Sequence, residues 1–562
     1  MWDDWLQPTS CDRAVTPPVA GGIVNEFVRP GFDRRSFLKY SGVLGAAATI
    51  TGGLSACSGG PASTGSVGAG ADTDLVTAVI GYGNNQSWDP TLSASAFTMA
   101  AMQHVYEGLL DTDPLTRQPY AALGTEVPAD LNATSWKFTL RDGAKWHDGQ
   151  PVTADDVVFT FQRILDPKLK VLTYNFFASW LKEVKKVDEK SVELLLNFPF
   201  PDGAPRLTIA KIMPKHVFSQ PGAWDLAKNG KAVGSGPYKQ VSHQPKSNTT
   251  FEAFADYNGP RPAAFKKMNW LSIVDASARV AKISGASAEA QISDNIPYAN
   301  IEQLKTSGLT VEGGKGMNHL FLMFNTANKP FDDVRVRQAL FTAIDTQKLI
   351  EVALKGRGRA STSFLNEDNP AYAKAKTVYS YDPAKAKALL AEAGVTDLTI
   401  NLLAVNLSWI VDCLPTIAAS WNAIGVKTTL QPQDTAAVFT KMDQNADYQV
   451  VAAASNPNQF GADADLILRY NYTQGGSWMK YTRWENSAGA KAIFAKMDQA
   501  VRATDADTRT KLTHEYLDLV AEQAVLYPVV HTELMTAWNG KKLSGVKAQP
   551  YPGINLLQTK RA

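Results

Sequence analysis

The sequence contains little cysteine, and this limits both disulfides and thiolate metal sites. Among its 562 residues only Cys11, Cys57 and Cys413 are cysteines. The first two fall within or at the end of an N-terminal leader, so the rest of the chain cannot form an internal disulfide. Cys413 lies in an apolar stretch, and we expect it to be a small buried residue.

Motifs for catalysis or for tightly bound ions are missing as well. The seven histidines include no pair at the i, i+4 spacing of a helical metal site, and there is no C-x-x-C and no G-x-S-x-G. Gly308 and Gly313 have the spacing of a phosphate loop, but the Lys-Ser/Thr that should follow is absent. The Asp pairs at 155–156 and 332–333 stand at predicted helix starts, where carboxylates accept backbone N–H groups. We therefore expect neither an enzyme nor a bound metal or cofactor.

An excess of either charge is also missing. The 56 Lys and Arg residues are balanced by 54 Asp and Glu residues, which leaves a formal net charge of +2. With no basic stripe, the chain has no electrostatic basis for binding nucleic acid. After the leader no run of 18 apolar residues occurs, so we expect no membrane span there.

The leader has the features of an export signal. Arg34 and Arg35 begin "RRSFLK", which resembles the twin-arginine consensus, although Asp33 departs from the usual Ser or Thr. A run rich in Gly, Ala and Thr follows and ends in Leu54-Ser55-Ala56-Cys57, which resembles a lipobox. The alternative, a transmembrane anchor over 40–56, is disfavoured because these 17 residues include four glycines and are short for a span.

This resemblance implies removal of residues 1–56 and acylation of Cys57. Residues 57–71 are dominated by Gly, Ser and Ala, which is typical of a flexible tether. We therefore expect an exported protein held by a lipid anchor at the outer face of the cytoplasmic membrane.

The body combines strand and helix patterns. "LVTAVI" at 75–80 predicts a strand that runs into a Gly- and Asn-rich loop, and 135–149 predicts a β-hairpin with its turn at Asp142-Gly143. Thr153 and Asp156 form a capping-box pattern before a helix, Asp332 is the expected cap of a second helix, and Asp382 that of a third. From 398 to 455 strands and helices alternate, which predicts a mostly parallel sheet covered by helices. Two lobes with a cleft between them are the expected architecture, and such clefts commonly hold small molecules.

Several stretches together resemble the large solute-binding proteins of ABC importers, the peptide/nickel/opine-binding family. The longest are "WKFTLRDGAKWHDGQPVTADDVVFTFQRILDP" (136–167) and "LFLMFNTANKPFDDVRVRQALFTAID" (320–345). Shorter ones are "VYEGLLDTDP" (105–114), "VGSGPYK" (233–239), "YDPAKAKALLAEAG" (381–394) and "WNGKKLSGV" (538–546). They occur in family order and extend over nearly all of residues 72–562.

The resemblance implies an α/β fold of the two-lobe periplasmic-binding-protein type (type II), in the large class with an extra inserted subdomain. Lobe I would comprise 72–106, 209–316 and 526–562, the insertion 107–208, and lobe II 317–525. It further implies a monomer whose lobes close over a small molecule or short peptide before docking on permease subunits in the membrane.

One family feature is missing. Peptide-binding members hold the α-ammonium group of the ligand with an aspartate in a loop that matches "SNPNQFGADADLIL" (455–468). Counting along this loop places that position at Asn458 or Phe460, neither of which is acidic. Asp463 remains as a possible amine partner, or as a loop carboxylate that binds local N–H groups. The departure weakens the case for free peptides without excluding them.

We expect four regions to line the ligand cleft. They are the loop after the first strand, the crossing between lobes, lobe II, and the 455–468 loop that differs from the family pattern. The candidate ligand-binding residues are Tyr82, Asn84, Asn85, Asn318, His319, Trp409, Asn456, Asn458, Gln459, Phe460, Asp463 and Trp478. A peptide or peptide-like ligand is the first hypothesis. A non-peptide solute that is opine-like, aromatic or sugar-derived is the alternative, and an extracytoplasmic enzyme or sensor is the third.

Overall fold

A computed structural model describes residues 74–562 except 84–86, 94, 221, 224–229, 286–287, 445–446, 458–460, 462, 475 and 477. The predictions for Arg34, Arg35, Cys57, Asn84, Asn85, Asn458, Gln459 and Phe460 therefore lie outside the described residues. In the part that is described, no helix is both long and apolar enough to cross a membrane.

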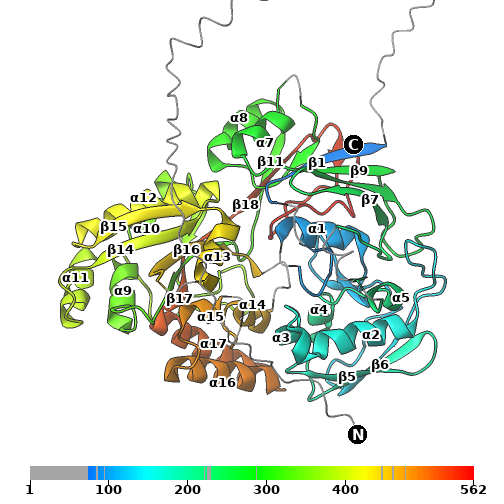
Figure 1. Cartoon of the computed structure of the whole chain (residues 1–562), viewed down its shortest axis with the longest axis horizontal. Helices are drawn as coiled ribbons and strands as arrows, with labels where there is room; N and C mark the ends of the chain where they lie inside the picture. Colours follow the sequence, from blue (N-terminus) through cyan, green and yellow to red (C-terminus); the bar gives the residue numbers. More distant parts are fainter. Residues whose placement is uncertain are drawn as a thin grey trace, which may run out of the picture. The chain divides into compact units, whose positions relative to one another are not determined.

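Lobe I is built on a seven-stranded mixed sheet (Figure 1). The strand order is β11 (Thr310–Gly314), β18 (Leu534–Trp538), β10 (Ile292–Ser293), β1 (Leu75–Ile80), β9 (Lys267–Ser272), β8 (Asn248–Ala253), β7 (Tyr238–Gln244). Strand β1 occupies the six residues predicted for it and runs parallel to β9 and β10. Helix α1 (Ala96–Val105) packs against this sheet through Phe97, whose ring meets that of Trp270. A second cluster joins the sheet to α7 (Ala276–Ile283), η3 (Tyr298–Asn300) and α8 (Ile301–Thr306).

Lobe II is built on a six-stranded sheet with the order β13 (Gly358–Ala360), β17 (Leu526–Thr532), β12 (His319–Phe324), β16 (Val450–Ser455), β14 (Thr399–Val405), β15 (Lys427–Gln433). Only β14, β15 and β16 pair in parallel, whereas β12 pairs antiparallel with β16 and β17. The parallel pairing predicted from the strands of 398–455 is confirmed for β14, β15 and β16, whereas β12, β13 and β17 extend the sheet with antiparallel pairs. The helices are α9 (Val334–Thr342), α10 (Thr346–Val352), α11 (Pro383–Glu392), α12 (Ser408–Ala423), α13 (Thr435–Gln444), α14 (Ala464–Asn471), α15 (Met479–Thr482), α16 (Ala488–Arg502) and α17 (Ala506–Gln523).

The inserted subdomain has its own core and sheets. Its three-stranded sheet has the order β4 (Ser135–Thr139), β6 (Ser191–Leu196), β5 (Leu181–Lys186), and β2 (Leu110–Thr112) pairs with β3 (Pro119–Ala121). The hairpin predicted over 135–149 is wrong, because the antiparallel partner of β4 is β6, more than fifty residues later. The remaining elements of this region are α2 (Ala154–Leu165), η2 (Pro167–Leu169), α3 (Tyr174–Phe177), α4 (Gly203–Leu207) and α5 (Lys215–Phe218).

Helix starts follow local side-chain chemistry. The Thr153 N–H donates to Asp156 Oδ2 (2.9 Å), which confirms the capping box of α2. Asp382 caps α11 as predicted, with Pro383 in the first turn. The cap of α9 is Asp333, one residue after the predicted Asp332, and it accepts from the Arg335 N–H (2.8 Å). Carboxylates at these positions satisfy N–H groups that the helix leaves unpaired.

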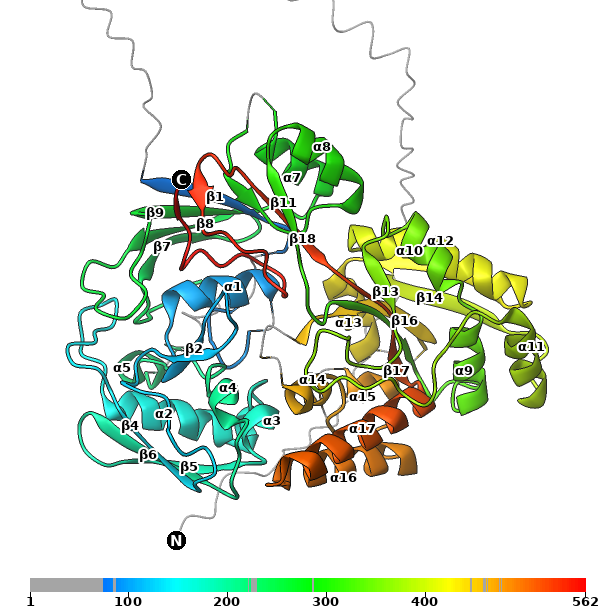
Figure 2. The same cartoon turned by 180° about the vertical axis from the view of Figure 1, so that it is seen from behind.

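The chain passes between the two large sheets twice among the described residues. Strand β11 leads through 315–318 into β12, and β17 continues through Glu533 into β18, which Figure 2 shows end to end in red. The three-part division remains a prediction, but a boundary at 526 would cut β17 from its sheet, so Glu533 is the better limit. At the first crossing a Cβ on Gly314 would lie 1.8 Å from the Gln549 carbonyl oxygen, so the C-terminal segment approaches the end of β11 here because glycine has no side chain.

Two short strands, β19 (Leu543–Ser544) and β20 (Lys560–Arg561), pair near the C-terminus.

Candidate functional site

The first group of candidate residues lies beside the first crossing, where β12 begins at His319 and β16 ends at Ser455. His319 faces Ser455 on one side and His531 on the other in the strand register, and the ring centroids of the two histidines are 5.6 Å apart. The His319 Nδ1–H donates to the Met317 carbonyl (2.7 Å), and burial lowers the pKa of the imidazole to about 4. His319 is therefore neutral near pH 7, and its Nε2 carries a lone pair.

Several buried polar atoms around this point have no hydrogen-bond partner within the described ranges. They are Asn318 Nδ2, His319 Nε2, Asn456 Oδ1 and His531 Nδ1. Asn456 also reaches lobe I, because its Nδ2 donates to the Pro550 carbonyl (3.0 Å). Leaving a buried donor or acceptor unpaired costs about 1–3 kcal/mol, so these atoms suit the polar groups of a bound solute. The structure thus brings together Asn318, His319 and Asn456 as predicted candidates, and adds His531, which sequence reasoning missed.

Tyr82 lies on the lobe I side, just after β1. It is half-buried beside the lobe I core, and its carbonyl accepts from Ser272 Oγ (2.8 Å). The loop is fixed by the buried carboxylate of Asp294, which accepts from the N–H groups of Gly81 (2.7 Å) and Gly553 (2.8 Å). Burial raises the pKa of Asp294 to about 6. The loop that begins at Tyr82 is therefore anchored at its base.

The two candidate tryptophans lie in the hydrophobic core of lobe II. Trp409 on α12 and Trp478 are each 5% exposed. The Trp478 ring meets Phe321 at 4.9 Å and Phe439 at 5.1 Å between centroids. A structural role accounts for both side chains, and their contact with ligand stays a prediction. Cys413 is buried as expected, and its Sγ donates to the Trp409 carbonyl (3.1 Å).

Asp463 is held by protein groups on both sides. It caps α14 by accepting from the Leu466 N–H (2.8 Å), and it forms an ion pair with Arg206 of the inserted subdomain (2.7 Å). Arg206 also contacts Asp465 (3.1 Å), and its side chain has no exposed surface. Asp465 in turn pairs with Arg469 (2.8 Å). Burial alone would lower the pKa of Arg206, but Asp463 and Asp465 hold it above its ordinary value.

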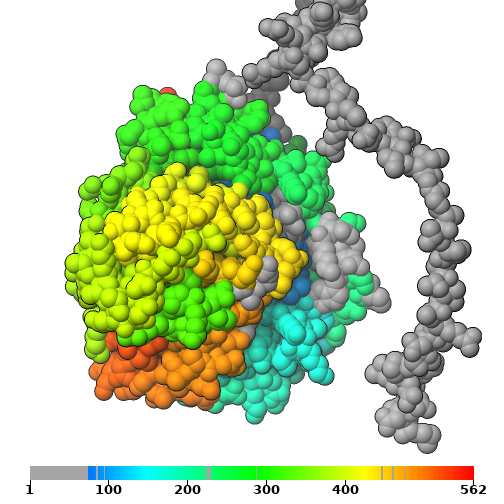
Figure 3. All heavy atoms as spheres, turned by 60° about the vertical axis from the view of Figure 1, so that its left-hand side comes forward, coloured from blue at the N-terminus to red at the C-terminus, as the bar shows by residue number. Residues whose placement is uncertain are grey.

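The inserted subdomain and lobe II also share apolar contacts at this point. Leu466 and Val501 belong to lobe II by sequence, yet they are buried in the hydrophobic cluster of the inserted subdomain with Phe176 and Phe177. In the space-filling view the orange surface of lobe II helices meets the blue-green surface of the inserted subdomain (Figure 3). Arg206 and α14 therefore lie in a contact between two parts that are distant in sequence.

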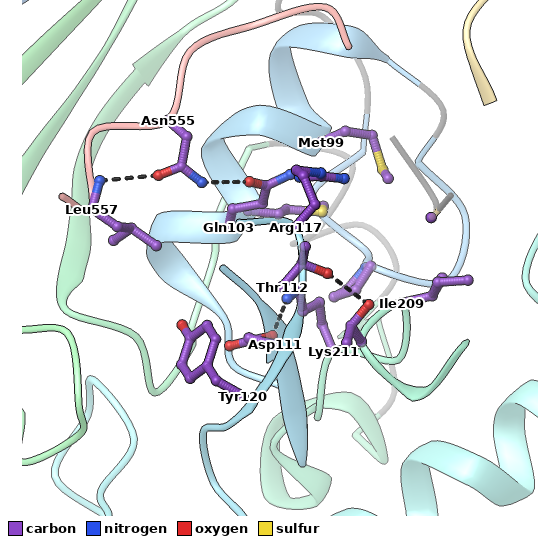
Figure 4. A pocket seen from close by; sticks show the side chains of 14 residues that line it. Met99, Gln103, Asp111, Thr112, Arg117, Tyr120, Ile209, Lys211, Asn555 and Leu557 are labelled. Carbon is purple, nitrogen blue, oxygen red and sulfur yellow. Dashed lines mark hydrogen bonds and ion pairs between the residues drawn. The ribbon is translucent and has the colours of Figure 1, made fainter. Parts of the chain in front are cut away.

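A small cavity adjoins this contact (Figure 4). Its volume is about 50 Å³, which suits one small chemical group. Thr208, Ile209 and Lys211 reach it from the segment after α4, and Gly461 reaches it from lobe II. Its walls are tied together by hydrogen bonds from Thr112 Oγ1 to Thr208 Oγ1 (2.9 Å) and from Asn555 Nδ2 to Gln103 Oε1 (2.7 Å), and by the ion pair of Lys211 with Asp111. The remaining lining residues are Pro90, Met99, Met102, Arg117, Tyr120 and Leu557.

Sequence reasoning missed this cavity for an identifiable reason. Its described walls come from five segments, 90–103, 111–120, 208–211, 461 and 555–557, and no local pattern marks their meeting. Asp111 falls inside "VYEGLLDTDP", so the resemblance pointed to the segment without assigning the side chain. Within the described part of the chain no group of three or more His, Cys, Asp or Glu residues has the arrangement of a metal site.

The chain forms two large β-sheets covered by helices, and it crosses between them twice. Buried polar groups lie beside the first crossing, and a cavity lies close to the contact of the inserted subdomain with lobe II. This arrangement is that of a two-lobe solute-binding protein. Comparison with known proteins identifies which kind. The model of the bacterial extracellular solute-binding proteins, family 5 Middle, matches residues 118–477, and the chain belongs to this family. The model of the twin-arginine translocation pathway signal matches residues 31–51, which confirms the predicted export signal.

Individual relatives agree with this assignment. The chain is 26% identical over 485 residues to the dipeptide-binding protein of Escherichia coli K12, covering 80% of this chain and 88% of the relative. It is 29% identical over 467 residues to heme-binding protein A of Haemophilus influenzae, covering 77% and 82%. Among solved structures, the binding protein AgaA of A. tumefacien R10, in complex with agropinic acid, is 25% identical and superposes with a TM-score of 0.75 over 87% of this chain and 99% of that one. The predicted two-lobe fold is thereby confirmed.

Proposed function

We propose that this protein captures a small peptide or peptide-like solute by closing its two lobes and delivers it to the membrane subunits of an ABC importer. The observation that carries the proposal is the set of unpartnered buried atoms at Asn318, His319, Asn456 and His531, beside the first crossing. Closure around a solute that pairs with these atoms removes their desolvation cost, so ligand favours the closed state.

A non-peptide solute is the second candidate. Asp463, the remaining acid in the loop where peptide-binding relatives hold an ammonium group, is occupied by Arg206 and by the Leu466 N–H. The similarity to a dipeptide-binding protein supports the first candidate, and that to a structure with agropinic acid supports the second.

Thermal unfolding of the mature chain, made without residues 1–56 and with Cys57→Ser, tests the proposal. The ligand panel contains di- to pentapeptides with free and acetylated N-termini and a set of sugar acids, sugar–amino acid conjugates and aromatic acids. A ligand at about a hundred times its Kd stabilises the folded state by about 2.7 kcal/mol, which corresponds to a rise of several degrees in Tm. A shift with peptides supports the first candidate, and a shift only with non-peptide solutes replaces it with the second. Failure of the entire panel counts against both.

We also propose that the exported protein is monomeric and anchored by a lipid on Cys57. The lipobox-like Leu54-Ser55-Ala56-Cys57 supports the anchor. The full-length chain should sediment with membranes, whereas the Cys57→Ser variant should appear in the soluble extracellular or periplasmic fraction. Equal membrane association of the two would contradict lipidation.

A further inference from the structure

The contact between α4 and α14 contains a guanidinium whose donors are directed to fixed partners. Arg206 donates from Nη2 to Asp463 (2.7 Å) and Asp465 (3.1 Å), from Nε to Asp463 (3.3 Å) and from Nη1 to the Phe176 carbonyl (3.1 Å). The group also lies over the Phe200 ring, 5.3 Å from its centroid. An arginine held by two carboxylates and a carbonyl in this way is oriented as well as neutralised.

The buried charges in this contact balance without a ligand. Arg206 and Arg469 carry two positive charges, and Asp463 and Asp465 carry two negative charges. The side chains of the four residues are at most 14% exposed. A further cation brought into this region would meet Arg206 with no unpaired carboxylate to offset the repulsion.

The adjoining cavity offers an ammonium group no unpaired carboxylate among its described lining residues. The segment 206–211 presents Arg206 to α14 and Thr208, Ile209 and Lys211 to the cavity, so the two features are neighbours. The carboxylate of the described lining, Asp111, forms an ion pair with Lys211. With that carboxylate already paired, the cavity suits a neutral group of a solute better than a cationic one.

We propose that Arg206 is a specificity-determining residue that takes the place of a ligand ammonium group, so that the protein selects solutes whose end at this site carries no positive charge. This inference rests on the proposed function and specifies its ligand class: N-acylated peptides, or carboxylic acids without a free amine, rather than free peptides. Arg206 acts on ligand choice by satisfying Asp463 and Asp465 and by repelling a second cation.

The test compares one peptide in four forms, with its N-terminus free or acetylated and its C-terminus acid or amide, by calorimetry on the mature Cys57→Ser chain. Wild type should bind the acetylated acid at least tenfold more tightly than the free-amine form. Arg206→Met should reverse this preference, because it leaves Asp463 and Asp465 with one cation and the ligand ammonium supplies the other. Adding Asp463→Asn to Arg206→Met should remove the acquired affinity for the amine.

Arg163→Met is the matched control. Arg163 is also a buried arginine paired with an aspartate, Asp89 (3.0 Å), but both residues of this pair precede lobe II in the chain. Its replacement should leave the ratio of affinities for free and acetylated ligand unchanged. Arg206→Lys should retain the wild-type preference because it keeps the charge. Arg206→Gln replaces Arg206→Met if the latter does not fold, as judged by circular dichroism.

The outcomes separate this inference from the proposed function. Tighter binding of the free-amine form by wild type overturns the inference and leaves the peptide function standing. If wild type binds no peptide but Arg206→Met acquires affinity for the amine, the peptide candidate fails and the inference holds. If Arg206→Met acquires none, the inference is wrong whatever wild type binds.

Discussion

Two buried arginines show how the contact between parts of this protein differs from the interior of one lobe. Arg337 on α9 is 1% exposed and donates to the main-chain carbonyls of Gln523 (2.9 Å), Phe331 (2.7 Å) and Asp332 (3.0 Å). Burial lowers its pKa to about 10. Arg206, equally buried, is paired with two carboxylates from the other side of a contact, and its pKa lies above the ordinary value.

The difference between the partners of Arg337 and those of Arg206 is explained if the proposed separation of the lobes exposes Arg206 to water and leaves Arg337 buried. Arg337 ties the end of α17 to the loop before α9, so it stays inside lobe II and needs only neutral carbonyl partners. Arg206 joins segments 257 residues apart, and both it and its carboxylates become hydrated if the contact opens. Water solvates both members of a charged pair when such a contact opens, so an ion pair is compatible with a contact that forms and separates.

The largest effect should come from the interior arginine. Arg337→Met removes the donor to three carbonyls and should reduce the free energy of unfolding by about 3–5 kcal/mol, measured by urea denaturation of the mature chain. Its control is Arg335→Met, since Arg335 is on the same helix but its side chain is 45% exposed beside Asp333, and its replacement should change stability far less than that of Arg337. Equal effects of the two would remove the distinction between interior and surface.

Two leucines on α14 allow the interior of lobe II to be compared with its contact to the inserted subdomain by the same substitution. Leu468 is buried in the lobe II core, and Leu466 is buried in the cluster of the inserted subdomain. Leu468→Ala should lower the free energy of unfolding by about 2–5 kcal/mol. If the contact forms only on the proposed lobe closure, Leu466→Ala should leave ligand-free stability within about 1 kcal/mol but weaken ligand affinity by about tenfold or more, because the closed state alone would bury this side chain.

The two measurements are urea denaturation without ligand and calorimetry with it. A large loss of ligand-free stability in Leu466→Ala would mean that the inserted subdomain and lobe II stay in contact when the protein is empty. Arg206 would then not be exposed by opening, and the contrast with Arg337 would need another cause.

Acid should destabilise the lobe II interior through its neutral histidines. Burial lowers the pKa of His319 to about 4 and that of His531 to about 3, whereas an unfolded histidine titrates near 6.5. The unfolded chain therefore binds protons that the folded chain cannot, and stability falls as pH decreases from about 6.5 toward 4. Between pH 7 and pH 5 each such histidine should cost about 2 kcal/mol.

Unfolding free energies at pH 7 and pH 5 measure this effect. His104 and His147, whose pKa values burial lowers to about 4, contribute in the same direction. Asp294 opposes them, because its folded pKa near 6 favours protonation of the folded state over the same range. The double replacement His319→Gln and His531→Gln should flatten the decrease, and an unchanged slope would show that these two imidazoles are not neutral and buried.

Elements that depend on neighbouring residues could be predicted from the sequence. Elements that depend on pairing between residues far apart in the chain could not. Strand β1, the Thr153–Asp156 capping box and the Asp382 cap depend on neighbouring residues and were predicted correctly. The partner of β4 lies more than fifty residues away, so the turn signal at Asp142-Gly143 suggested the wrong pairing. The mixed pairing of the lobe II sheet likewise depends on β12 and β17, the strands on the lobe II side of the two crossings, which lie far in the chain from β14, β15 and β16.

The same limit applied to the site. The resemblance led to Asn318, His319 and Asn456 through the crossing and the loop after β16, and the structure shows buried polar atoms of all three there, while their contact with ligand stays a prediction. Asp463 was assigned as either an amine partner or a local cap, and it is a cap that also pairs with Arg206. Nothing in the sequence around Arg206 marks it, since its partners are contributed by a helix formed 257 residues later.

The smallest effect is expected at the rim of the contact that contains Arg206. Arg509 Nε lies 3.5 Å from Asp202 Oδ2, and the two side chains are 24% and 46% exposed. A partly exposed ion pair of this kind contributes about 0–1 kcal/mol, since water reaches both charges in either state. Arg509→Ala should therefore change unfolding stability and ligand affinity by less than about 0.5 kcal/mol, and its small effect should vanish in 0.5 M salt, which screens exposed charges. An effect on ligand choice as large as that of Arg206→Met would mean that net charge across the contact, rather than the buried geometry of Arg206, decides which solutes the protein accepts.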